Sequence, residues 1–264
     1  MEYTTIVVEK NKDDFISKII LNRPEASNAL TGNMIGEIGH ALLDANEDDS
    51  IHVVIITGRG KSFCAGVDLK YFKETVSTLW QQEEWYRWAN RTMINPLAQL
   101  SKPVIAEVNG AALGGGYEMM LACDLAVAAE DAIIGDQHIN FGLIGPGGST
   151  QRTTWLLGPR RAKEVILMGK RLTGIEAEKI GLVNRAVPKN QLDRTVHEMA
   201  AQIAQKSPVA VRIAKALINR ALQIDLSTSE QLEIMSAIVN ATSEDFVEGM
   251  IAFNEKRKPV FKGK

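Results

Sequence analysis

Acid–base chemistry in this chain of 264 residues would centre on Glu118, which follows three consecutive glycines at residues 114–116. A strand pattern precedes these glycines and a helix pattern follows them, so the N–H group of Gly115 lies at a helix start. Such N–H groups point outward at the positive end of the helix dipole and can hold a developing oxyanion. Glu118 lies about one turn further on, which can bring its carboxylate close to the atoms held there. In the alternative, the glycines form only a tight connection and Glu118 only stabilises the helix dipole.

His138 is the second candidate for acid–base chemistry. Imidazole titrates near neutral pH, so His138 can exchange a proton with a substrate or with water. Asp136, two residues earlier, can orient the imidazole or act as an acid or base itself. In the alternative, His138 only lines a pocket and Glu118 is the sole acid–base group.

Short β-rich segments alternate with helical patterns in the first half of the chain, and these elements must position Glu118 and His138. The segments that favour strands are Phe15–Leu21, Val53–Thr57 and Val104–Val108. The second and third are apolar without alternation, as is typical of strands covered on both faces. Between the first two, apolar residues recur at helical spacing from residue 34 to residue 42. The order of strand, helix and strand predicts an α/β core.

Signals for helix starts replace strand signals from about residue 159 onward. They are Thr173 with Glu176, Ser207 before Pro208, and Ser227 with Glu230. No linker rich in Gly, Ser or Pro separates the two parts of the chain, so we expect these helices to pack onto the core as an annex. We expect a core of residues 1–195 and a helical C-terminal region of residues 196–264.

An aromatic run occupies a predicted helix between residues 72 and 100, and it contains Trp80, Trp85, Tyr86 and Trp88. Trp85 and Trp88 share one helix face, and such a stripe is more often core than pocket. Glu107 lies inside the otherwise apolar strand predicted at residues 104–108. If its carboxylate is buried there, it needs a hydrogen-bonding or charged partner, and the sequence does not identify one.

Composition excludes several classes of protein. The net charge is −2, from 30 basic and 32 acidic residues, which argues against binding nucleic acid along its backbone. The longest apolar runs fall far short of the roughly 18 residues that cross a bilayer, so we expect no membrane span. Two cysteines, Cys64 and Cys123, indicate neither a disulfide framework nor a zinc site. The N-terminal sequence has the character of neither a signal peptide nor a transit peptide, and we expect a cytoplasmic location.

Ordered motifs along the whole chain give a more specific indication. They are Leu21–Ala26 with Asn28–Leu30, Ser62–Leu69, Lys102–Ala106, Asn109–Gly116, Gly181–Asn184 and Glu255–Pro259. In this order they resemble the enoyl-CoA hydratase/isomerase family, the crotonases. The resemblance implies an α/β fold made of a spiral of β-β-α turns, followed by a helical region that mediates trimer formation. It also implies a homotrimer or a homohexamer.

The resemblance further implies an enzyme that binds an acyl-CoA thioester and stabilises an enolate. Coenzyme A is then part of the substrate, and no metal or other cofactor is implied. By motif position, the N–H groups of Val67 and Gly115 would form an oxyanion hole, and Glu118 matches the family's first catalytic glutamate. The residues expected to bind substrate or CoA are Arg23, Lys61, Ala65, Asp68, Leu69, Lys70 and Gly114.

The chain departs from the family at the second catalytic carboxylate. Where the family usually has Gly-x-Pro-Glu, His138 occupies the position of the glutamate, and Gly145-Pro146 inverts the usual Pro-Gly order. We expect hydration of, or double-bond isomerisation in, an α,β-unsaturated acyl-CoA. The alternatives are another crotonase reaction, such as thioester or C–C hydrolysis, and a homologue that binds acyl-CoA without turnover.

Overall fold

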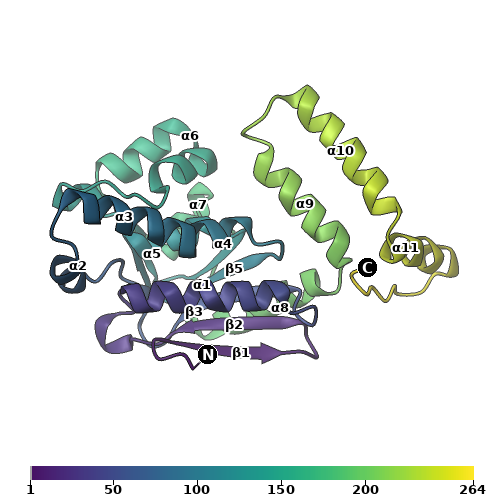
Figure 1. Ribbon diagram of the computed structural model, residues 1–264, viewed down its shortest axis with the longest axis horizontal. Helices are drawn as coiled ribbons and strands as arrows, with labels where there is room; N and C mark the ends of the chain where they lie inside the picture. The colour runs from purple at the N-terminus through teal and green to yellow at the C-terminus, as the bar shows by residue number, and fades with distance from the viewer. Residues whose placement is uncertain (1) are drawn as a thin grey trace.

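Two β-sheets form the core of the structure, a computed structural model that describes residues 2–264 (Figure 1). The larger sheet has the strand order β1-β2-β3-β5-β7-β10. Strand β1 is antiparallel to β2, and the other neighbouring strands of this sheet are parallel. Its strands are β1 (Ile6–Asn11), β2 (Ile16–Leu21), β3 (Val53–Gly58), β5 (Val104–Val108), β7 (Leu125–Ala129) and β10 (Arg185–Val187).

The smaller sheet has the order β4-β6-β8-β9, in which only β9 is antiparallel to its neighbour. Its strands are β4 (Ser62–Cys64), β6 (Ala111–Leu113), β8 (Ile133–Gly135) and β9 (Leu172–Thr173). Along the chain, β3-β4, β5-β6 and β7-β8 each place one strand in the larger sheet and the next in the smaller one, and helices follow each pair. This repeat is the expected spiral of β-β-α turns, and the predicted fold class is confirmed.

Helices surround the sheets and fill the connections. The α-helices of the core are α1 (Gly32–Glu47), α2 (Leu69–Thr75), α3 (Leu79–Ala89), α4 (Asn95–Gln99), α5 (Gly115–Ala122), α6 (Ser149–Leu167), α7 (Gly174–Ile180) and α8 (Leu192–Ala204). Those that follow are α9 (Pro208–Arg220), α10 (Leu226–Ala241) and α11 (Glu244–Glu255). Short 3-10 turns are η1 (Pro24–Ala26), η3 (His138–Phe141) and η4 (Lys189–Gln191), and η2 (Asn90–Ile94) is a π-helical turn.

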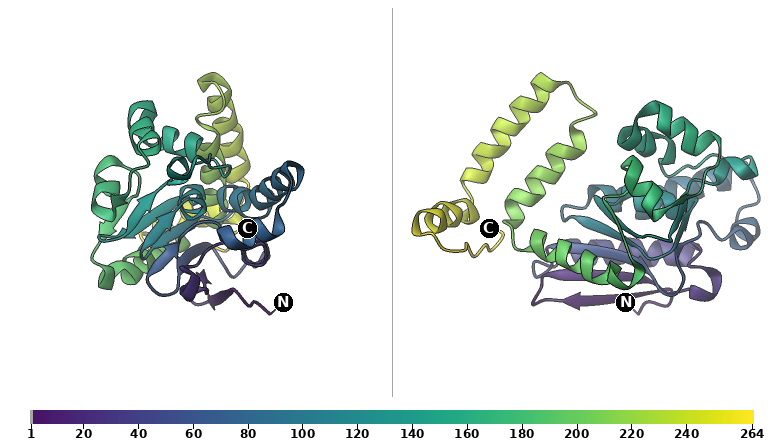
Figure 2. Two further views of the ribbon diagram at one scale, coloured as in Figure 1. Left: turned by 90° about the vertical axis from the view of Figure 1, so that its left-hand side faces the viewer. Right: turned by 180° about the vertical axis from the view of Figure 1, so that it is seen from behind.

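The larger sheet is covered on both faces. Helix α1 packs against β1 and β2, whereas α8 packs against β3, β5 and β7. Figures 1 and 2 show these two helices on opposite faces of the sheet. Every residue of β3 and β5 is buried, which explains why these strands lack alternating polar residues.

Glu107 in β5 has a partner that the sequence did not identify. Lys18 Nζ of β2 lies 2.7 Å from Glu107 Oε2 and also contacts Asp193 at the start of α8. Burial raises the pKa of Glu107, and the hydrogen bond and charge of Lys18 oppose that rise. The ion pair therefore compensates the carboxylate for lost hydration.

One predicted helix start was wrong, whereas two others and the helix of the aromatic run are confirmed. The helix predicted for the aromatic run between residues 72 and 100 is α3, which the Thr78 side chain caps. Helix α10 is capped by Asp225, whose carboxylate accepts the N–H of Thr228, and not by the predicted pair Ser227 and Glu230. A carboxylate takes this place because a charged acceptor binds the free N–H groups of a helix start strongly. The confirmed starts are Thr173 with Glu176, and Ser207.

The last three helices project from the core, as Figure 1 shows. Helix α9 is attached to it by an ion pair of 2.6 Å between Lys215 Nζ and Asp124 Oδ2. The boundary expected after residue 195 falls inside α8, which packs on the sheet, so the division of the chain into two regions stays a prediction. Within residues 2–264, no helix is long and apolar enough to span a membrane.

Candidate active site

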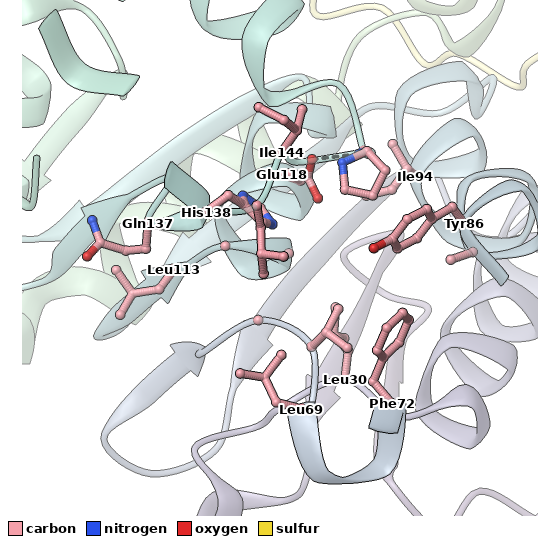
Figure 3. A pocket seen from close by; sticks show the side chains of 18 of the residues that line it. Leu30, Leu69, Phe72, Tyr86, Ile94, Leu113, Glu118, Gln137, His138 and Ile144 are labelled. Carbon is pink, nitrogen blue, oxygen red and sulfur yellow. Dashed lines mark hydrogen bonds between the residues drawn. The ribbon is translucent and has the colours of Figure 1, made fainter. Parts of the chain in front are cut away.

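A cavity of about 450 Å³ opens between α3, the β4–α2 connection and the start of α5. Most of its wall is apolar, whereas Glu118 and His138 lie together at one part of it (Figure 3). The wall is formed by Leu30, Ile35, Ala65, Gly66, Val67, Leu69, Phe72, Gln82, Trp85, Tyr86, Ala89, Asn90, Met93, Ile94, Leu113, Gly114, Gly115, Glu118, Gln137, His138, Phe141, Leu143, Ile144, Pro146, Gly147 and Arg171.

Glu118 is held in the first turn of α5 and is only 4% exposed. Its Oε1 accepts the backbone N–H of Gly147 at 2.5 Å, from the loop before α6 (Figure 3). Burial raises the pKa of Glu118 to about 7, although the positive charge of His138 and the Gly147 N–H oppose the rise. A carboxyl group with this pKa can both accept and return a proton near neutral pH.

Asp136 holds the imidazole of His138 in one orientation. The two side chains form a hydrogen bond between Asp136 Oδ1 and His138 Nδ1, and Asp136 is 2% exposed. Burial lowers the pKa of His138, but the hydrogen bond that its Nδ1–H donates to Asp136 and the negative charges of Glu118 and Asp136 hold it above its ordinary value. Burial raises the pKa of Asp136, yet the hydrogen bond and charge of His138 bring it below its ordinary value. Because Nδ1 is occupied, Nε2 is the ring nitrogen left for chemistry.

Glycines in the loop before α6 let Glu118 and His138 approach each other. A methyl group added at Gly145 would lie 2.7 Å from Glu118 Oε1 and 2.9 Å from His138 Cε1. A methyl group at Gly147 would lie 2.7 Å from Glu118 Oε2. Any side chain at these two positions would therefore displace Glu118 or His138. This steric limit favours glycine at position 145, where the family's usual Pro-Gly order would place proline.

The backbone N–H groups of Val67 and Gly115 have no hydrogen-bond acceptor among the described residues. Around Val67, Leu30 N–H donates to Gly66 O at 2.7 Å and Asp68 N–H donates to Leu30 O at 3.0 Å, which leaves the Val67 N–H outside this bridge. A methyl group at Gly115 would lie 3.6 Å from Val67 N, so the two groups are close neighbours. Both residues line the cavity.

The residues expected to bind substrate or CoA divide into two groups. Ala65, Leu69 and Gly114 line the cavity. Lys61 precedes β4 and Lys70 lies in α2, and both are exposed and outside the cavity lining. Their role in binding CoA stays a prediction.

Arg23 and Asp68 bind each other, with 3.1 Å between Arg23 Nη2 and Asp68 Oδ2. Asp68 also accepts the N–H of Tyr71 and so caps α2, and Arg23 Nη1 donates to Ala29 O at 2.6 Å. These contacts show that the two residues stabilise the start of α2 and the neighbouring chain at Ala29. Their role in binding substrate or CoA stays a prediction.

Sequence reasoning missed much of the cavity wall. Trp85 and Trp88 both pack against the core, as expected, and Trp85 also lines the cavity. Gln82, Arg171 and the loop residue Ile144 were not predicted at all. The regular spacing of Gln82, Tyr86 and Asn90 on one face of the helix was the available signal.

No cluster of three or more His, Cys, Asp or Glu side chains that could hold a metal ion occurs in residues 2–264. In the same range, Cys64 and Cys123 are both free thiols.

Comparison with known proteins places the chain in one family. The sequence profile described as "Enoyl-CoA hydratase/isomerase" matches residues 11–264. The chain is 39% identical over 257 residues to "Enoyl-CoA hydratase domain-containing protein 2, mitochondrial" from Homo sapiens, covering 96% of this chain and 87% of that protein. It is 36% identical over 262 residues to "Crotonyl-CoA hydratase" from Syntrophomonas wolfei subsp. wolfei, with 99% of each chain covered.

Among solved structures, the fold is similar to that of an enoyl-CoA hydratase from Bacillus anthracis. The TM-score is 0.93 at 39% sequence identity, and the match covers 99% of this chain and 100% of the other.

Proposed function

The chain belongs to the enoyl-CoA hydratase/isomerase (crotonase) family, and from that premise we propose that it adds water to an α,β-unsaturated acyl-CoA. The observation that carries the proposal is the meeting of Glu118 and His138 in an apolar cavity that also contains two unpaired backbone N–H groups. Hydration needs two proton transfers and a negative charge held on the thioester oxygen, and this site has a group for each requirement.

The N–H groups of Val67 and Gly115 are proposed to bind the thioester carbonyl oxygen. Attack of water on Cβ moves an electron pair through Cα and forms an enolate, whose negative charge lies on that oxygen. Donors that already point at the developing charge stabilise the transition state more than the ground state. One such donor contributes about 3 kcal/mol.

Glu118 and His138 are proposed to carry the two protons. The Glu118 carboxylate takes a proton from water while the water oxygen bonds to Cβ. The imidazolium of His138 then gives the proton on Nε2 to Cα of the enolate. The product has one hydroxyl at Cβ and one new hydrogen at Cα, and solvent returns the enzyme to its starting protonation state. Asp136 supports the imidazolium through the hydrogen bond to Nδ1.

Isomerisation of the double bond is the second candidate, and the pKa of Glu118 supports it. A carboxyl group with a pKa of about 7 can remove a proton from one carbon and return it to another without help from His138. Thioester or C–C hydrolysis and binding without turnover remain further alternatives for this family.

An assay with crotonyl-CoA separates these possibilities. Hydration consumes the conjugated thioester and gives 3-hydroxybutyryl-CoA, which product chromatography identifies. Isomerisation gives an isomeric enoyl-CoA, and thioester hydrolysis gives free CoA. Binding without any product would contradict the proposed activity.

We further propose that copies of this chain assemble into a homotrimer or a homohexamer through the C-terminal helices. No residue of α10 is fully buried, and its apolar side chains Ile234, Met235, Ile238 and Val239 are all more than half exposed. Exposed apolar area of this extent is unfavourable in water, and a second copy would cover it. Light scattering on the purified protein measures the mass. The cytoplasmic location stays a prediction.

A further inference from the structure

A polar stripe crosses the otherwise apolar part of the cavity wall that α2, α3 and η2 form. Gln82, Tyr86 and Asn90 are four residues apart and all line the cavity. Their neighbours in this part of the wall are Phe72, Trp85, Ala89, Met93 and Ile94. A cavity for a plain hydrocarbon chain does not need hydrogen-bonding groups here, so the stripe requires an explanation.

The ring of Tyr86 forms a cluster with two other aromatic side chains, Phe72 and Trp85, which also contact each other. Phe72 stacks on it with ring centres 5.9 Å apart, and Trp85 meets it edge-on at 5.7 Å. Figure 3 shows the Tyr86 hydroxyl directed into the cavity. These ring contacts and the hydrogen bond from Gln82 hold the hydroxyl at this position.

Gln82 determines which part of this hydroxyl is free. Its Nε2 donates a hydrogen bond to Tyr86 Oη at 2.8 Å, so the phenol oxygen acts as an acceptor there. No other described side chain or backbone group binds Tyr86 Oη. The O–H proton of Tyr86 is left to donate into the cavity.

Charge limits the kind of acceptor that can bind this proton. Arg171 is the one arginine or lysine among the described residues that line the cavity, and its Nε donates to Gln137 Oε1 at 2.8 Å. Gln137 and Tyr86 lie on opposite sides of the cavity (Figure 3). A carboxylate beside Tyr86 would be desolvated without a cation, so the acceptor must be neutral.

We propose that Tyr86 is a specificity-determining residue that donates a hydrogen bond to a neutral oxygen, a hydroxyl or a ketone, on the distal part of the acyl group. The proposal rests on the proposed function, because it assigns the acyl chain to this cavity. An all-hydrocarbon chain would exclude water from the Tyr86 hydroxyl and leave its proton without an acceptor. Such an unpaired group lowers the specificity constant by about tenfold or more relative to a substrate that pairs it.

The test compares pairs of substrates of equal chain length. Trans-2-enoyl-CoA thioesters of five, six and seven carbons are each assayed beside the same thioester with a terminal hydroxyl. For the wild-type protein, the ratio of kcat/KM for the hydroxylated over the plain substrate should peak at one chain length, because the hydroxyl must reach a fixed point. At that length, Tyr86→Phe should lower the ratio by about tenfold.

Tyr3→Phe is the matched control, because it removes a phenol hydroxyl that contacts His40 and lies outside the cavity lining. This variant should keep the wild-type ratio. A wild-type ratio without a peak, or a ratio that Tyr86→Phe leaves unchanged, would overturn the role of Tyr86 while hydration itself stands. A wild-type protein that forms no product from any of these thioesters would instead overturn the proposed function.

Discussion

Replacing Glu118 with glutamine should lower turnover and, at the same time, stabilise the folded protein above neutral pH. Burial raises the pKa of Glu118 from 4.5 to about 7. Between these values the folded state binds a proton that the unfolded state has released, so the free energy of unfolding falls as the pH rises through this window. At about 1.4 kcal/mol per pH unit, the ionised Glu118 destabilises the fold by about 3 kcal/mol above pH 7.

Glutamine keeps the shape of the side chain and an acceptor for the Gly147 N–H, but it does not ionise. The free energy of unfolding of Glu118→Gln should therefore exceed that of the wild type by up to about 3 kcal/mol near pH 8. Near pH 4 the two proteins should be equally stable, because Glu118 is protonated in both states. Turnover of crotonyl-CoA should fall by about a hundredfold or more, since the proton acceptor is lost.

Urea unfolding near pH 4 and near pH 8 measures the stability difference, and initial rates with crotonyl-CoA measure turnover. Glu84→Gln is the matched control, because Glu84 is exposed and lies outside the cavity lining. It should change neither quantity. A stability difference that is the same at both pH values would refute the buried, raised-pKa carboxyl, and wild-type turnover would remove Glu118 from catalysis.

Three other changes test the rest of the site and the assembly. Gly115→Pro deletes the N–H donor at the first position of α5, where proline fits a helix, and should lower kcat by about 100-fold to 1000-fold with an unchanged circular dichroism spectrum. Asp136→Asn weakens the hydrogen bond and removes the charge that raise the pKa of His138, so the alkaline limb of the pH profile of kcat/KM should move to lower pH; an unmoved limb would show that His138 is not the acid. Ile238→Glu places a charge on the exposed apolar face of α10 and should give monomers in light scattering, whereas an unchanged mass would show that this face is outside the interface.

Local patterns in the sequence predicted much of the fold. The strands around Val53 and Val104 were predictable because runs of apolar β-branched residues favour buried parallel strands wherever they occur. The starts of α7 and α9 were predictable because their capping side chains lie within three residues of the N–H groups that they bind. The wrong prediction also concerned a local contact. Asp225 and Ser227 can both cap the N-terminus of α10, and the sequence alone did not show that Asp225 does so.

The candidate site was predictable where neighbours in the chain are neighbours in space. Glu118 lies one turn after Gly115 because a helix begins there, and His138 is oriented by Asp136 at a separation of two residues. The family motifs added Val67, which no local pattern would have placed beside Gly115.

Tertiary structure decided the contacts between groups that are far apart in the chain. Lys18 became the partner of Glu107 across the sheet, and Gly147 became the hydrogen-bond donor to Glu118. Arg23 paired with Asp68, and the role of both residues in binding substrate or CoA stays a prediction. Periodicity and capping act within a few residues, and they determine which elements form. Desolvation and ion pairing instead depend on the distance between atoms brought together by packing, so the raised pKa of Glu118 exists only once packing has buried its carboxyl group.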